Sequence, residues 1–397
     1  LYTIKYGQNK QVLSIGRVQT PTLALIVNRQ LEIANFEPKQ YWELKTNYRN
    51  TTFSALIRKS DEEIAAEEEK NGGKKKIDNP GIDPIANREE GEALVERIKD
   101  LPFVVTSVGK KDGREFAPRL FDLTSLQVEC NKKFAYSADE TLKLIQSLYE
   151  KKVTTYPRVD TTFLSDDIYP KCPGILAGLK PYETLTAPLA GTKLNKSKKV
   201  FDNSKVTDHH AILPTHSMLQ ADLDALPKGE QNILKLIIAR TLMAVSKPFR
   251  YLETLLTTEC AGEEFTAKGK EILDEGWKAI ERKVLADILN RKKEFAALPP
   301  VEESECGILN AELKEGQTSP PKHFTEDTLL HSMETASADS MPEDAERQGI
   351  GTPATRAATI EKLVAKGFLE RKGDKKTKFL LPTDKGKALI TVMPEEI

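Results

Sequence analysis

The chain has 397 residues, in which 59 Lys and Arg nearly balance 60 Asp and Glu. Hydrophobic residues make up 39% of it, which excludes a disordered chain, because disordered chains are poor in Leu, Ile, Val and Phe. No apolar run approaches the roughly 18–20 residues of a membrane helix, and no secretory signal opens the sequence. We therefore expect a cytoplasmic protein without membrane contact, divided into about two to three domains.

The four cysteines are too widely spaced to form a Cys-x-x-Cys zinc pair, so free thiols are expected. The sequence opens at Leu1 rather than at a methionine, which suggests a piece of a longer protein. Charge is uneven along the chain, with basic stretches at 1–50, 141–210 and 348–397. If these stretches meet in space they form a groove suited to a polyanion, and otherwise they are solvated surface.

Residues 20–35 read as a helix, with Thr20 as N-cap and Pro21 at the first helical position. Segments 41–57 and 251–268 are rich in aromatic and β-branched residues and predict strands, the second with a turn at Gly262. The charged stretch 59–90, punctuated by glycine and proline, reads as a surface excursion.

The middle and the end of the chain have helical patterns. Segments 123–148 and 229–246 carry apolar faces, and a further helical pair covers 325–335 and 355–367. The last pair leads into a strand, a basic turn, a strand and a helix, which is similar to a winged helix. This order favours an outer helical domain, a strand-rich connector and an inner helical domain.

Tyr156 ends a short β-prone segment, because Pro157 follows it, and Arg158 stands two positions further on. A tyrosine hydroxyl has an ordinary pKa of about 10, so it needs a nearby cation to act as a nucleophile. Arg158 is such a cation, and its fork also matches the two free oxygens of a phosphodiester. Taken alone, the Tyr-Pro-Arg sequence is more often structural than catalytic.

Asp208, His209 and His210 are adjacent, and neighbouring histidines usually point in different directions. One imidazole could hydrogen-bond a phosphate while a carboxylate orients the other, as general acid–base catalysis requires. Structural histidines are the commoner alternative. A zinc site is disfavoured, because it needs further ligands at suitable spacing and the nearby sequence offers just one more candidate, His216.

Two glycine turns each lead into a predicted helix, where free N–H groups attract anions. The turn of residues 14–21 carries Arg17, Gln19 and Thr20, and the turn of residues 349–356 carries Thr355 and Arg356. Read singly, each turn is first a helix N-cap and only second an anion site.

Taken together, the segments resemble signature sequences of type IA DNA topoisomerases, most closely the bacterial topoisomerase III branch. The likeness spans about residues 12 to 390 and is carried, in order, by SIGRVQTPTLALIV, LFDLTSLQ, LYEKKVTTYPRVDTTFLS, KVTDHHAILPT, PPKHFTEDTLLHSME and GIGTPATRAATIEKLV.

The resemblance implies an ATP-independent isomerase that cuts one DNA strand, holds the 5′ end as phosphotyrosine, passes another strand and reseals the cut. Tyr156 matches the family's nucleophile, Arg158 the neighbouring arginine that positions the phosphate, and His209 the histidine of the cleavage site.

The resemblance also implies contacts with single-stranded DNA. Arg17, Gln19 and Thr20 match the strand-binding segment, and Thr355 falls where a glycine turn approaches the DNA backbone. In that turn Thr352 and Ala354 replace the arginine and serine of other branches, which leaves contacts at these two positions open.

The implied fold is multidomain and mainly α, a torus core with a β-rich arch and winged-helix-like elements. By analogy residues 1–36 and 298–397 form a helical single-strand-binding domain, 37–117 and 247–297 the arch, and 118–246 an inserted helical domain bearing Tyr156. We expect a monomer associated with the bacterial nucleoid.

The family's acidic Mg²⁺ cluster has no counterpart in the sequence, since Asp222 and Asp224 are followed by Leu226 where a glutamate is expected. The Mg²⁺ ligands are then expected in a missing N-terminal metal-binding domain, and the chain alone is expected to bind single-stranded DNA without cutting it. The zinc modules of some relatives are absent from the sequence as well.

Two other functions compete with this interpretation. A non-enzymatic winged-helix protein would prefer duplex DNA and read its bases, whereas the topoisomerase interpretation requires single-strand preference with little sequence dependence. An inactive scaffold with the same fold would form no covalent DNA adduct even with the metal-binding domain restored.

Overall fold

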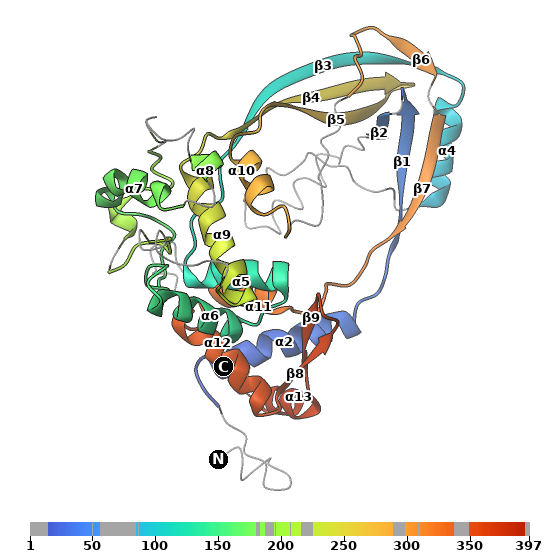
Figure 1. Cartoon of the computed structure of the whole chain (residues 1–397). Helices are drawn as coiled ribbons and strands as arrows, with labels where there is room; N and C mark the ends of the chain where they lie inside the picture. Colours follow the sequence, from blue (N-terminus) through green and yellow to red (C-terminus); the bar gives the residue numbers. More distant parts are fainter. Residues whose placement is uncertain are drawn as a thin grey trace.

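A computed structural model describes residues 15–49, 51–55, 85, 87–179, 183–186, 194, 196–206, 208–215, 225–288, 298–308, 310–336 and 349–393. The described elements form a ring, in which a curved sheet arches over one side and helices close the other (Figure 1). The expected arch is therefore present. The described residues contain a large sheet as well as many helices, so the mainly α fold class stays a prediction.

The arch is a seven-stranded sheet in which all neighbouring strands are antiparallel. The predicted strand segment 41–57 forms two strands, and 251–268 forms a hairpin that turns at Gly262, where φ is +83°. In sheet order the strands are β6 (Cys306–Ile308), β3 (Pro102–Glu115), β4 (Phe249–Cys260), β5 (Glu263–Asp274), β2 (Thr51–Ala55), β1 (Gln40–Tyr48) and β7 (Asn310–Gln317).

Three of these strands carry no clear sequence signal. Beyond Val105 most residues of β3 are exposed, so the alternation of apolar and polar residues that marks a half-buried strand is lost. Strands β6 and β7 lie in 298–397, a range predicted by analogy to belong with the terminal helices. Strand β7 nevertheless pairs with β1 of the sheet, from Gln317 opposite Gln40 to Asn310 opposite Asn47.

Helix α4 (Arg88–Ile98) covers one face of the sheet beside β1 and β7. It approaches so closely that a Cβ at Gly91 would lie 2.7 Å from Leu313 Cδ1. Of the predicted surface excursion at 59–90, residues 59–84 and 86 lie outside the described residues, while Ile85 pairs with Trp42. The sheet core is made by buried side chains of Leu44, Phe53, Ile98, Phe103, Val105, Leu256 and Phe265.

The first helical group, here called the central unit, packs around the almost wholly buried helix α9. The predicted helical segment 123–148 is two helices, because Asp122 and Ser137 each form a capping box and Ala135 between them has φ +55°. The helices are α5 (Leu123–Phe134), α6 (Ala138–Glu150), α7 (Cys172–Ala177), α8 (Glu183–Thr186), α9 (Lys228–Ala244) and α10 (Gly276–Val284).

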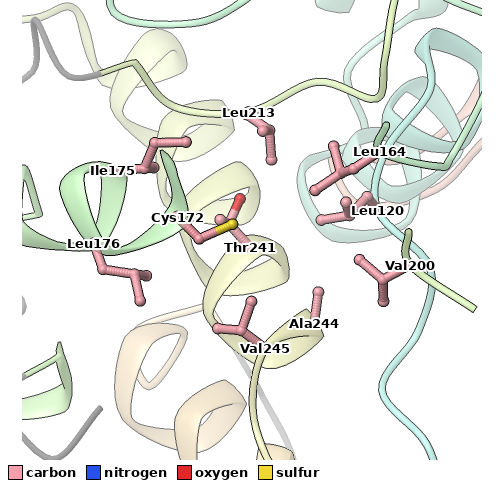
Figure 2. A pocket seen from close by; sticks show the side chains of 10 residues that line it. All are labelled: Leu120, Leu164, Cys172, Ile175, Leu176, Val200, Leu213, Thr241, Ala244 and Val245. Atoms are coloured by element: carbon pink, nitrogen blue, oxygen red, sulfur yellow. The ribbon is translucent and has the colours of Figure 1, made fainter. Parts of the chain in front are cut away.

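A void of about 10 Å³ lies inside the central unit. Side chains such as Leu120, Leu213 and Val245 line it, and the Cys172 thiol points among them (Figure 2). Burial raises the pKa of this thiol to about 11. A void so small and apolar is a packing gap rather than a ligand site.

The second helical group, here called the terminal unit, joins residues from both ends of the described chain. Helix α2 (Gln19–Ala34) begins before the predicted start, so Val18 and not Thr20 is its N-cap. Pro21 lies at the third helical position, where its missing N–H has no intrahelical partner to lose. The other elements are α11 (Glu326–Thr335), α12 (Pro353–Ala365), β8 (Leu369–Gly373), β9 (Lys378–Pro382) and α13 (Asp384–Thr391), in the predicted order.

None of the helices in the described ranges combines the length and the apolarity that crossing a membrane requires.

Candidate active site

The backbone around Tyr156 is fixed from both sides. On one side Thr154 bridges to Pro214, and the N–H of Thr155 donates to the carbonyl of Leu213 at 2.9 Å. On the other side the N–H of Leu123, the first residue of α5, donates to the carbonyl of Val159 at 3.1 Å. Tyr156 thus lies on a short segment anchored to the core of the central unit, with a single bridge in place of the β-strand that its sequence suggests.

The Tyr156 ring is half-buried between two other rings. The His209 ring lies against it, with centroids 4.7 Å apart and planes at 40°. On another side the Tyr149 ring, from the end of α6, meets it edge-on at 5.5 Å. Sequence reasoning missed Tyr149, although an aromatic residue at the end of a helix just before the Tyr-Pro-Arg motif was a usable signal.

The two adjacent histidines separate as expected. His209 is exposed and turns to Tyr156, whereas the half-buried His210 ring places Nδ1 2.7 Å from the carbonyl oxygen of Ala211. Arg158 is also exposed, two residues beyond the tyrosine. The structure therefore brings a tyrosine ring and an imidazole into contact, with an exposed guanidinium two residues along the chain, and these three groups are suited to a phosphodiester.

The described residues contain no group of three or more His, Cys, Asp or Glu side chains that could hold a metal ion. His216, Asp222 and Asp224 lie outside the described residues. The expected Mg²⁺ therefore has no ligand set in the part of the chain that the structure covers.

The turn before α2 exposes one of its three predicted DNA-binding side chains. Gln19 and Thr20 are buried, and the Thr20 hydroxyl accepts a hydrogen bond from the N–H of Gly16 at 3.0 Å. Arg17 is exposed. Gln19 and Thr20 therefore shape the turn that presents Arg17.

The second glycine turn lies directly against the first. Gly351 has φ +68°, and a Cβ there would lie 2.8 Å from Val18 Cγ1. The exposed Thr355 closes a capping box at the start of α12, with its hydroxyl accepting from the N–H of Thr352 at 3.0 Å. The structure thus brings Arg17 and Thr355 to neighbouring helix starts.

The motif suggests an Arg356 side chain exposed to an anion, but the structure buries it. Its side chain is 3% exposed, and its guanidinium donates to the carbonyls of Ile350 and Gly351 at 3.2 and 3.1 Å. It holds the glycine turn from inside and is not available to an anion at the surface. Burial accordingly lowers its pKa, while Glu334 partly opposes that shift.

The sequence model of the DNA topoisomerase family matches residues 1–397, and the chain belongs to this family. Its relatives place it among the type IA enzymes. The DNA topoisomerase 3 proteins of Bacillus licheniformis and Bacillus subtilis are each 35% identical to it over 396 residues, covering 97% of the chain and 51% of the relative. The resemblance of the sequence motifs is thereby confirmed.

Among solved structures, full-length topoisomerase I from Thermotoga maritima has the same fold, with a TM-score of 0.69 at 22% identity. The match covers 96% of this chain and 56% of that one. The chain spans about half the length of the curated relatives it matches.

Proposed function

We propose that this chain carries the strand-cleaving tyrosine of a type IA topoisomerase and that Tyr156 attacks a phosphodiester of single-stranded DNA. The observation that carries the proposal is the ring of Tyr156, which contacts the rings of both His209 and Tyr149, with the exposed Arg158 two residues further along the chain. A ring clamped in this way presents its hydroxyl from a defined position, which is what an in-line displacement at phosphorus requires.

The reaction exchanges one phosphodiester for another. The Tyr156 oxygen forms a bond to phosphorus and loses its proton, while the bond from phosphorus to the 3′ oxygen breaks and that oxygen takes up a proton. The 5′ end is left as phosphotyrosine, and the reverse reaction reseals the strand. Because the bond energy is retained in the intermediate, no ATP is needed.

The neighbouring side chains bind the phosphate, support the tyrosine ring and hold the DNA strand in this proposal. The Arg158 guanidinium pairs with the free phosphate oxygens and offsets the charge that develops there. The His209 imidazole steadies the tyrosine ring and hydrogen-bonds the phosphate. Arg17, Gln19, Thr20 and Thr355 form the strand-binding turns, with Arg17 and Thr355 facing the DNA backbone and the other two shaping their support.

The proposal assigns domains by their separate cores. Residues 118–246 and helix α10 form the cleavage domain, 37–117, 247–274 and 298–317 the arch, and 1–36 with 318–397 the single-strand-binding domain. This moves one predicted boundary from 298 to 318 and takes α10 out of the predicted arch, because Val284 and Leu285 lie in the core of the central unit. Mg²⁺ and the catalytic glutamate belong in this proposal to a metal-binding domain outside these residues. The protein works as a monomer on nucleoid DNA in the bacterial cytoplasm.

The test is a covalent-adduct assay with a matched pair of variants. The chain is incubated with single-stranded DNA and Mg²⁺, with and without the metal-binding domain of a relative as a separate chain, and then denatured. Tyr156→Phe should abolish the adduct and keep DNA binding, whereas Tyr149→Phe should retain both. Adduct formed by the Tyr156→Phe variant would refute the nucleophile, and adduct from the unmodified chain alone would refute the division between domains.

A winged-helix DNA-binding protein is the second candidate. It is favoured by the order of α11, α12, the β8–β9 hairpin and α13, with Lys375, Lys376 and Lys378 at or beside the hairpin turn. Such a protein binds duplex more tightly than single strands. Competition between the two DNA forms at one salt concentration distinguishes the candidates.

A further inference from the structure

The ring is closed at one place by non-covalent contacts alone. In chain order, each step between the terminal unit and the central unit passes through strands of the sheet. The two units meet again on the opposite side of the ring, where α5 and α6 of the central unit lie against α11 and α12 of the terminal unit (Figure 1). Separating this junction would open the ring without unfolding either unit.

A buried carboxylate crosses the junction. Glu326, the first residue of α11, is 4% exposed, and its Oε2 accepts a hydrogen bond from the N–H of Ala138 at 2.7 Å. Ala138 is the first residue of α6, so a side chain of the terminal unit satisfies a free N–H of a helix in the central unit. A carboxylate at a helix N-terminus also interacts favourably with the helix dipole.

A cation from the terminal unit balances this carboxylate. Arg371 of β8 donates through Nε to Glu326 Oε1 at 2.8 Å and also pairs with Glu361 of α12. Glu361 and Arg371 both belong to the terminal unit. Glu326 therefore forms a hydrogen bond across the junction. Glu361, bound to the same arginine, reaches the central unit only through its charge, which acts on Lys143 of α6.

Two further hydrogen bonds cross the same junction, beside a long ion pair of 4.0 Å between Lys132 Nζ of α5 and Asp327 Oδ2. The N–H of Asp327 donates to Asn131 Oδ1 at 3.2 Å, and Arg356 Nη1 donates to the Thr124 hydroxyl at 3.2 Å. Ala138 and Val128 add apolar contact with the terminal core. Polar groups exchange their partners for water when they separate, so such a junction parts more readily than an apolar core.

We propose that Glu326 is the latch of this ring: it caps α6 across the junction and holds α5 and α6 against α11 and α12 until the ring opens there. The proposal rests on the proposed function, since a strand that is to be enclosed must enter the ring. Glu326 is a positioning residue in this account and takes no part in the cleavage chemistry.

Hydrogen exchange at the Ala138 amide reports the latch directly. Glu326→Ala should accelerate its exchange by about tenfold or more, since a buried hydrogen bond to a charged group is lost. The matched control Glu361→Gln loosens the same arginine but removes no hydrogen bond to α6, only an exposed charge interaction with Lys143, so it should leave this exchange within about twofold. Thr124→Val should also accelerate the Ala138 amide, because one opening event breaks both contacts.

Exchange within α9 shows whether the central unit stays folded in each variant. Equal acceleration in Glu326→Ala and Glu361→Gln, or acceleration that extends through α9, would overturn the latch. Glu326→Gln keeps an acceptor for the Ala138 amide while removing the charge, and it should give an intermediate rate. A Gln variant that exchanges faster than the Ala variant would contradict capping.

Spin labels at Lys143→Cys on α6 and Lys387→Cys on α13, in a Cys306→Ser background, measure the separation of the units. Glu326→Ala should add a longer-distance population that Glu361→Gln lacks, and identical distributions would overturn the proposal. The adduct assay is independent of this distance. If the Glu326→Ala variant forms the adduct but shows no longer-distance population, the latch is refuted. If the ring opens but no adduct forms in the presence of the metal-binding domain, the cleavage function is refuted.

Discussion

The ring of Tyr156 lies against the ring of His209, with centroids 4.7 Å apart, although the two residues come from distant parts of the chain. Each is carried by a segment that pairs with the other: Thr154 bridges to Pro214, and Thr155 exchanges hydrogen bonds with Leu213. Backbone pairing between the two segments therefore positions the ring contact of Tyr156 and His209. Substitutions at His209 and at its neighbour His210 can test whether the two histidines have different roles.

His209→Ala is expected to lower the rate of adduct formation by roughly 10²–10⁴-fold, the range for loss of a general acid–base group. Single-stranded DNA affinity should change little. The matched control is His210→Asn, since His210 instead lies 2.7 Å from the carbonyl of Ala211. If both substitutions lower the rate equally, the effect comes from local folding and not from the imidazole at Tyr156.

Arg158→Ala should reduce cleavage by about 10²–10³-fold, as expected when one preorganised charge contact to the transition state is lost. Arg158→Lys keeps the charge but not the two-pronged geometry, so partial recovery is expected. Single-turnover adduct formation measures both variants. Full activity in the Ala variant would remove Arg158 from the site.

Gly351→Ala and Gly367→Ala separate backbone strain from contact between the two glycine turns. Both residues have positive φ, +68° and +71°, but a Cβ meets Val18 at 2.8 Å only in the first and nothing within 4 Å in the second. Each should lose about 1–2 kcal/mol of unfolding free energy from strain.

Gly351→Ala should lose about 1–3 kcal/mol more than Gly367→Ala from overpacking, and it should also weaken single-stranded DNA binding by displacing Arg17. Denaturant unfolding and DNA titration give the two quantities. Equal losses of stability in the two variants would show that the turns do not press on each other in solution.

Arg17→Ala should weaken single-stranded DNA binding similarly for all sequences and reduce the salt slope by about 0.7 for one lost phosphate contact. The control is Lys99→Ala, since Lys99 follows α4 on the arch and pairs with Glu96. Titrations at several salt concentrations measure the slope. An unchanged slope in the Arg17 variant would remove that residue from the backbone contacts.

Cysteine reactivity tests the packing of the central unit and the sheet. Cys306 is exposed, whereas Cys130, Cys172 and Cys260 are buried, and burial raises the pKa of each buried thiol. Below a raised pKa a thiol carries little reactive thiolate, so at pH 8 only Cys306 should react quickly with a disulfide reagent. All four should react after denaturation, and a fast native reaction in the Cys306→Ser variant would contradict the described cores.

The sequence by itself determined those features whose signals lie within a few neighbouring residues. Periodic apolar residues predicted α9 and α12, alternation predicted β1 with β2 and β4 with β5, and the motif around Tyr156 identified the family. These signals are local because helix periodicity, turn residues and caps depend on nearby side chains.

Only the tertiary structure decided which segments meet. It placed β7 beside β1, buried Arg356 under the glycine turn that was predicted to expose it, and set the Glu326 carboxylate on the first N–H of α6. A strand's hydrogen-bond partner, the burial of a charged side chain and a cap supplied by another unit each depend on distant residues. The reason is physical: their free energy arises from contacts between segments that meet only once the chain has folded.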